Sequence, residues 1–274
     1  MRRLEKRMRK SFLRGALTAF TAWTCTALIA HNAHADLSTT KPVRIGASSG
    51  PGKTSAFGAN GMDGGIPWVD GLGRTQVIFG DTSSATNRLC SETSPLPETP
   101  DPNWPYPPHR ISVSSTIAWT TDNYLLDGIS YTDMLRDGPY FTPAILNTGH
   151  TVPSGAVAVG LTDLVHFAST SLPAGMEGFE CDNLAVAFGF IGTRTATPDG
   201  QGRFVRNDAF GWWGATSNFA QGSLLKRGNF VYLFGITAGR SGGVKLARAQ
   251  IHSPLTGLSW EYWSGTTWSS DEPN

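Results

Sequence analysis

Short apolar or alternating stretches, separated by turn-forming residues, follow one another from residue 57 onward. Alternation with a period of two is typical of strands with one buried face, and intervening clusters of Gly, Pro, Asn and Asp are typical of hairpins. No long stretch repeats its apolar residues with a helical period. The pattern predicts an all-β chain with strands at 64–69, 75–80, 111–119, 128–132, 155–160, 163–169, 184–191, 222–226, 229–236 and 243–251.

The composition agrees with a globular chain that is rich in turns. Of the 274 residues, 32 are Gly and 17 are Pro, which together make about 18% of the chain against a usual level of roughly 12%. Aromatic residues make up 11% and include nine Trp, which excludes a disordered chain.

Residues 1–35 have the three parts of a signal peptide. A basic segment is followed by the uncharged stretch 15–30 and by small residues that end at Ala35. Sixteen apolar residues are short for a retained membrane anchor, because a bilayer core is roughly 30 Å thick. We therefore expect a secreted or cell-envelope protein that begins at Asp36 and has no membrane segment after cleavage.

Charge and spacing exclude several classes of partner. The formal net charge of +1 becomes about −5 without the basic leader, and a chain without a basic excess is not expected to bind nucleic acid. Cys90, Cys181 and the scattered His residues show no zinc spacing, so no metal or cofactor is expected. Whether the two cysteines form a disulfide stays open. We assign 36–56 as an N-terminal segment that leads into a domain spanning 57–274.

One hairpin carries a pair of carboxylates. A turn at Asp70–Gly73, centred near residue 72, places Asp63 directly opposite Asp81, since the two residues lie equally far from that centre. Opposed residues of an antiparallel pair share a face with Cβ atoms about 5 Å apart, where like charges are destabilising. Either one Asp accepts hydrogen bonds in a turn, or the two form an acid and base pair for catalysis.

Strands that end in Phe-Gly suggest repeated sheets. The stretch 77–80 has a counterpart at 232–235 and a weaker one at 186–189. Four-stranded propeller blades would explain these repeats, and a two-sheet sandwich is the alternative.

Several motifs resemble one known family. Residues 61–67 and 77–82 resemble its T-D-x-G-I-P and F-G-D-T signature, and 152–155, 232–248 and 261–268 resemble three further motifs. The family was first known as domain of unknown function 4185 and is now glycoside hydrolase family 183. Met62 departs from the signature, which has Thr at that position.

The resemblance implies a five-bladed β-propeller with endo-D-arabinanase activity on the cell-wall arabinan of mycobacterial arabinogalactan and lipoarabinomannan. It implies that Asp63 and Asp81 are catalytic. Their expected separation fits a retaining glycosidase, with Asp81 as nucleophile and Asp63 as acid/base, or the reverse.

The motifs cover about three of the five blades, so we expect a C-terminally truncated propeller. Its open blade edges would call for self-association or a complementing chain. The alternative function is a non-catalytic propeller that binds cell-wall polysaccharide.

Four further residues are candidates for binding the sugar. Each also has an ordinary structural explanation: Arg240 can brace neighbouring blades, Asn183 and Asn218 can lie in turns, and Trp68 can pack in the core.

Overall fold

The computed structural model describes residues 48–49, 52–84, 112–122, 129–138, 140–146, 150–170, 187–240 and 242–272. The chain forms two units, Met1–Arg44 and Ile45–Asn274, and every described residue belongs to the second. The predicted signal peptide, Cys90, Cys181 and Asn183 lie outside the described residues. In the part that the structure describes, no helix is long and apolar enough to cross a membrane.

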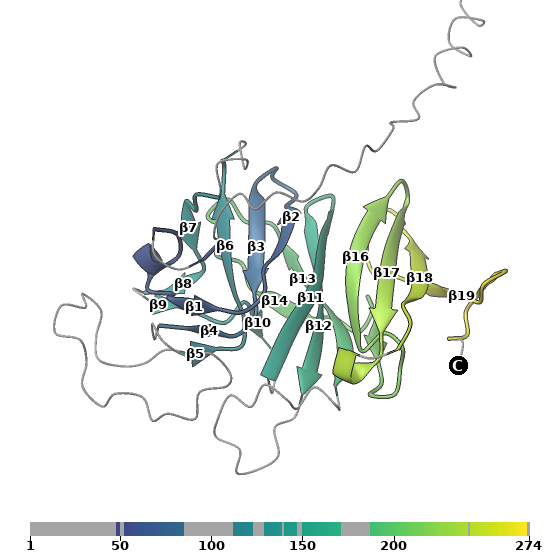
Figure 1. Ribbon diagram of the computed structural model, residues 1–274. Helices are drawn as coiled ribbons and strands as arrows, with labels where there is room; N and C mark the ends of the chain where they lie inside the picture. Colours follow the sequence, from purple (N-terminus) through teal and green to yellow (C-terminus); the bar gives the residue numbers. More distant parts are fainter. Residues whose placement is uncertain are drawn as a thin grey trace, which may run out of the picture. The chain divides into compact units, whose positions relative to one another are not determined.

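The described residues are all-β, with short 3-10 turns at η1 (Ser55–Phe57) and η3 (Ala238–Arg240) (Figure 1). The first of three main sheets has the order β2-β3-β6-β7, and the third runs from β16 to β20 in chain order. The second has the order β11-β12-β13-β14-β10, with β15 beside β13. Two small sheets, β1-β4-β5 and β8-β9, complete the arrangement.

The strands have the following bounds: β1 (Gly61–Met62), β2 (Ile66–Val69), β3 (Thr75–Phe79), β4 (Thr82–Ser83), β5 (Ser112–Val113), β6 (Thr116–Thr120), β7 (Asp133–Met134), β8 (Arg136–Asp137), β9 (Tyr140–Phe141), β10 (Ile145–Leu146), β11 (His150–Val159), β12 (Thr162–Thr170), β13 (Phe188–Thr195), β14 (Phe204–Arg206), β15 (Trp212–Trp213), β16 (Gln221–Arg227), β17 (Phe230–Ile236), β18 (Lys245–Gln250), β19 (Trp260–Trp263) and β20 (Trp268–Ser269).

The long predicted strands are confirmed, and the short segments required correction. The predicted strand at 111–119 is divided into β5 and β6. The prediction at 128–132 is wrong for residues 129–132, which form no strand, and the next strand, β7, begins at Asp133. Phe79 ends β3 as expected, whereas Phe188 begins β13 instead of ending a strand. Two-residue strands such as β1 and β4 are too short for an alternating pattern to show them.

The hairpin of β2 and β3 has the predicted register. Ile66 pairs with Ile78 and Val69 pairs with Thr75, which places the centre of the hairpin at residue 72. Asp70 closes the turn, since its Oδ1 accepts hydrogen bonds from the backbone amides of Leu72 and Arg74, both at 2.9 Å. Burial raises the pKa of Asp70, but hydrogen bonds and charge from its neighbours outweigh that effect and the net pKa is lowered.

β11 is the strand that joins the three main sheets, because it contacts both β2 and β16. Near the end of β11, the backbone of Gly160 lies against Gly71 in the turn after β2. Near its beginning, Ser154 Oγ accepts a hydrogen bond of 3.2 Å from the amide of Gly222 in β16. β11 therefore contacts the first sheet through the turn after β2 and the third sheet through β16.

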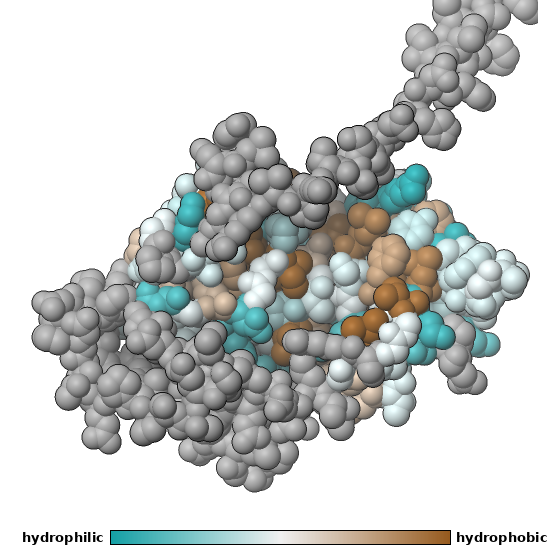
Figure 2. All heavy atoms as spheres, viewed as in Figure 1, coloured by the Kyte–Doolittle hydropathy of each residue, from teal (hydrophilic) through white to brown (hydrophobic). Residues whose placement is uncertain are grey.

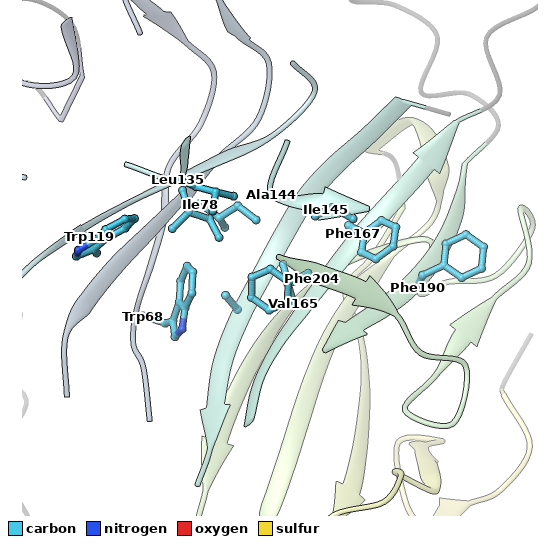
Figure 3. Packing of buried hydrophobic residues seen from close by; sticks show 12 residues of the cluster. Trp68, Ile78, Trp119, Leu135, Ala144, Ile145, Val165, Phe167, Phe190 and Phe204 are labelled. Atoms are coloured by element: carbon cyan, nitrogen blue, oxygen red, sulfur yellow. The ribbon is translucent and has the colours of Figure 1, made fainter. Parts of the chain in front are cut away.

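An apolar core fills the space between the first and second sheets (Figure 3). Trp68 of β2 is 7% exposed and meets Phe204 of β14 edge to face, with ring centroids 6.2 Å apart. Ile78 and Val165 belong to the same buried cluster. Aromatic and branched side chains of this size contribute about 1.5–3 kcal/mol each when buried, so this cluster fixes how the two sheets pack.

A buried chain of polar side chains crosses the same interface. Arg194 of β13 donates from Nε to Asp163 of β12 at 3.1 Å and from Nη2 to Gln76 of β3. Gln76 donates to Asp70 Oδ2 at 2.5 Å, and Arg74 donates to the same oxygen at 2.7 Å. Burial raises the pKa of Asp163 and lowers that of Arg194. Because two carboxylates face two guanidinium groups, the network joins the sheets without a buried excess of charge.

The second and third sheets meet through a bulge in β11. The register of β11 against β12 shifts between Pro153 and Gly155, which leaves Ser154 unpaired and turned toward β16. The Ser154 hydroxyl donates to Nδ1 of His166 at 2.7 Å, and His166 Nε2 donates to the Phe219 carbonyl at 3.0 Å. His166 is fully buried, and burial lowers its pKa to about 4.

We expect Gly155→Ala to destabilise the fold by about 1–3 kcal/mol, because a Cβ there would lie 2.6 Å from the Leu224 amide nitrogen. Chemical denaturation of the full chain measures the loss. Gly214→Ala is the control, since a Cβ at Gly214 meets nothing within 4 Å. Equal stability of the two variants would show that β11 and β16 do not approach each other this closely.

The stability of the fold should fall between pH 6.5 and about pH 4. Unfolded chains protonate histidine near pH 6.5, whereas folded His166 resists a proton until about pH 4, so the unfolded state binds more protons in this window. The free energy of unfolding falls by about 3 kcal/mol by the acid end of this pH range, and this contribution does not change above pH 6.5. Urea denaturation gives the free energy of unfolding at pH 7.5 and at pH 4.5. The difference between these two values should be smaller for His166→Gln than for wild type. His252→Gln, at an exposed residue, should leave the difference unchanged.

Candidate functional site

The two signature aspartates lie together where the small sheet of β1, β4 and β5 meets the hairpin of β2 and β3. The amide of Asp63 donates to the Asp81 carbonyl at 2.9 Å, and the Asp63 carbonyl accepts from the Gly80 amide at 2.8 Å. The neighbouring pair Met62 and Thr82 keeps the register of the hairpin. Asp63 therefore faces Asp81 across the two strands, as the turn geometry predicted.

Asp63 makes its two backbone hydrogen bonds to two consecutive residues of the opposite strand, because it donates to the carbonyl of Asp81 and accepts from the amide of Gly80. The register on either side is the same, so the strands approach closely here without an inserted residue. Gly80 permits this approach, since a Cβ there would lie 3.3 Å from the Asp63 carbonyl oxygen. The glycine of the Phe-Gly-Asp stretch thus has a steric role next to the acidic pair.

Asp81 has a partner that the sequence did not reveal. His150 Nε2, at the first residue of β11, lies 2.7 Å from Asp81 Oδ1. The side chains of His150 and Asp81 are 23% and 26% exposed, so both are accessible from solvent. The histidines are dispersed along the sequence, and the strand predicted there begins only at residue 155, so no local pattern marked His150.

The two aspartates do not act as turn caps. Among the described residues, the Asp63 carboxylate makes no hydrogen bond, and Asp81 Oδ1 bonds only to His150. The capping role belongs to Asp70, whose two carboxylate oxygens accept hydrogen bonds from Leu72 and Arg74. At its turn, the hairpin thus holds Asp70, whose carboxylate is fixed by hydrogen bonds from its neighbours. At its open end, the hairpin holds the exposed Asp63 opposite Asp81.

Hydroxyl groups connect the small sheet to β11 beside this pair. Ser114, just after β5, shares a hydrogen bond of 2.9 Å with Thr151, which follows His150 in the chain. β5 itself pairs with β4 through Val113 and Thr82. These contacts hold the start of β11 against the segment that carries Asp81.

The other candidate residues are placed differently. Asn218 immediately precedes the third sheet, and its amide donates to Glu272 at 2.7 Å. The backbone of Arg240 lies in η3, directly after β17, and its side chain lies outside the described part, as does Asn183. Since β16 begins where β17 ends, Asn218 and Arg240 lie at the same end of the third sheet.

The choice of Trp68 as a substrate-binding residue requires correction. Its side chain is buried between the first and second sheets, where it packs on Phe204 and lies 5.5 Å from the Arg194 guanidinium. An alternating strand pattern cannot tell an indole in an inter-sheet core from one that faces a sugar. The exposed tryptophan of β15, Trp212, is 57% exposed.

Within the described ranges, no three His, Cys, Asp or Glu side chains gather as metal ligands. The chemistry that the site itself offers comes from two carboxylates and an imidazole. A pair of carboxylates can transfer a proton and stabilise or capture a developing cation without any further group.

Comparison with known proteins identifies the family of this chain. No curated protein sequence matches the chain. A structure from Bacteroides ovatus, described as a "putative hydrolase", is 14% identical with a TM-score of 0.49, and the match covers 80% of this chain and 58% of that one. This chain thus spans less than two thirds of the length of that protein. Residues 49–274 match the model of the domain of unknown function DUF4185, and the chain belongs to that family.

Proposed function

We propose that this chain is an exported glycoside hydrolase of family 183 that cleaves internal α-D-arabinofuranosyl linkages in cell-wall D-arabinan. The observation that carries the proposal is the placement of Asp63 directly across from Asp81, with both side chains accessible to solvent. Hydrolysis of a glycosidic bond requires two carboxyl groups that flank the bond, and this strand pairing would supply them.

The proposed reaction retains the configuration at the anomeric carbon. Opposed strand residues have Cβ atoms about 5 Å apart, which suits a retaining pair better than the separation of about 6.5–9.5 Å in inverting enzymes. Asp81 attacks the anomeric carbon while Asp63 gives a proton to the departing glycosidic oxygen. Water then attacks the glycosyl-enzyme intermediate and yields its proton to Asp63, which releases Asp81 and regenerates the acid.

The substrate assignment rests on the resemblance to the family and on the polar residues that are candidates for binding the sugar. The signature stretches 61–67 and 77–82 resemble those of the arabinan-cleaving family. Asn218 and Arg240 would supply hydrogen bonds to sugar hydroxyls from the third sheet, and Asn183, which lies outside the described residues, is a further candidate. The leader 1–35 would bring the protein to the cell envelope, where this polysaccharide occurs.

The proposed fold is a five-bladed propeller, of which the three main sheets would be blades. Support comes from their meander order and from the contacts of β2, β11 and β16. The third sheet exposes Leu225 and Phe234, and Figure 2 shows apolar surface over this sheet. A complementing chain or a second copy would cover that surface.

The second candidate is a propeller that binds cell-wall polysaccharide without cleaving it. The exposed Trp212 and Phe188 favour it, because aromatic faces stack on sugars without any catalytic group. Binding of arabinogalactan without release of oligosaccharides would support this candidate against the hydrolase.

Purified full-length protein should release arabino-oligosaccharides from mycobacterial arabinogalactan. Asp63→Asn and Asp81→Asn should each lower the rate by about 10³-fold or more, because each removes a group that acts on the reacting bond. Chromatography of the products measures the release. Asp137→Asn is the control, since its side chain is 83% exposed and lies on β8. Release that is unchanged in both site variants would exclude the acidic pair as the catalytic group.

Asp63→Asn should leave the free energy of unfolding equal to that of wild type or raise it by up to about 1 kcal/mol. The substitution removes one of two like charges on opposed residues and breaks no hydrogen bond of the described structure. Urea denaturation at pH 7 gives the value. A clear loss of stability would instead assign the Asp63 side chain a structural role in the strand pairing.

A further inference from the structure

We propose that His150 is a positioning residue for Asp81, holding one carboxylate oxygen so that the other is presented to the substrate. This inference rests on the proposed function and assigns a third residue to the same site. It also gives the two aspartates different roles, because Asp81 has a side-chain partner and Asp63 has none among the described residues.

The contact joins two sheets that are distant in the chain. His150 opens β11 of the second sheet, and Asp81 follows β3 of the first, so the 2.7 Å contact spans 69 residues. On the second sheet His150 pairs with Thr170, and the next residue, Thr151, is tied to Ser114. The backbone that carries the imidazole is therefore fixed on both sides, and the ring is held at Asp81 instead of moving freely in solvent.

The chemistry of the contact fixes the direction of the hydrogen bond. An ionised carboxylate can only accept, so His150 Nε2 must carry the proton and donate it to Asp81 Oδ1. A bond of this kind between a ring N–H and an anion is among the stronger ones in proteins. Asp81 Oδ2 accepts no hydrogen bond from the described residues and stays available.

The direction of this hydrogen bond gives Asp81 and Asp63 different roles. The acid/base carboxyl must take up and release a proton at the reacting bond, whereas Asp81 Oδ1 is already engaged as the acceptor of the hydrogen bond from His150. Asp81 is therefore suited to act as an anion, that is, as the nucleophile. The exposed carboxyl of Asp63, with no such neighbour in the described structure, is suited to exchange protons with substrate and water.

Substitutions of His150 test the positioning role in the full chain with arabinogalactan as the substrate. His150→Ala should lower kcat by about 10²-fold with little change in KM, because a misplaced nucleophile slows the chemical step more than binding. His150→Gln should recover activity to within about tenfold of wild type, since its amide N–H can reach the position of Nε2. His252→Gln, at an exposed histidine outside the site, should behave like wild type. Unchanged kcat in His150→Ala, or no recovery with Gln in a folded protein, would overturn the proposal.

Nuclear magnetic resonance tests the contact without relying on activity. The Nε2 resonance of His150 should move in Asp81→Asn and stay in place in Asp63→Asn. The same response in both variants would overturn the inference while leaving the hydrolase open to its own assay. Wild-type protein that shows the selective response but releases no oligosaccharide would disprove the proposed function, and with it the catalytic part of this inference.

Discussion

The carboxylate of Asp70 holds the turn on which the register of the first hairpin depends. Its two oxygens accept hydrogen bonds from the amides of Leu72 and Arg74 and from the Arg74 guanidinium, so this turn closes in one geometry. A slip of one residue would turn every side chain of β2 to the other face. Trp68 would then leave the inter-sheet core, and Asp63 would no longer face Asp81. Core and candidate site thus depend on one short turn.

The same carboxylate also belongs to the network that joins the first two sheets. Through Gln76 and Arg194 it is connected to Asp163 of the second sheet. Buried ion pairs gain little net stability, because desolvation offsets much of their attraction. Their directional bonds instead favour one packing of the sheets over its alternatives. The bond between His150 and Asp81 is a second directional contact between the first two sheets, at the beginning of β11.

Sequence reasoning succeeded where short-range chemistry decides the structure. The Asp-Gly-Leu-Gly turn has few possible geometries, so the centre of the hairpin and the opposition of Asp63 and Asp81 followed from counting. The position of His150 did not follow, because it depends on how β11 packs on the first sheet, 69 residues away. Trp68 was misassigned for a related reason, since its burial comes from Phe204 of another sheet. Two-residue strands such as β1 were missed because they form only by pairing with a neighbouring strand and are too short to show an alternating pattern.

The aspartates of this hairpin show how one residue type serves two purposes. Asp70 is 4% exposed, and hydrogen bonds from its neighbours keep its pKa low, so its charge contributes to the fold. Asp63 is exposed and stands opposite Asp81 in the strand pairing, a position where like charges weaken a sheet. A close glycine contact keeps the two strands in this pairing, and an imidazole from another sheet binds only one of the two carboxylates. Local features that oppose stability in this way are expected at functional sites. The chemistry of the chain should therefore be sought at this end of the hairpin, while the other end holds the sheets together.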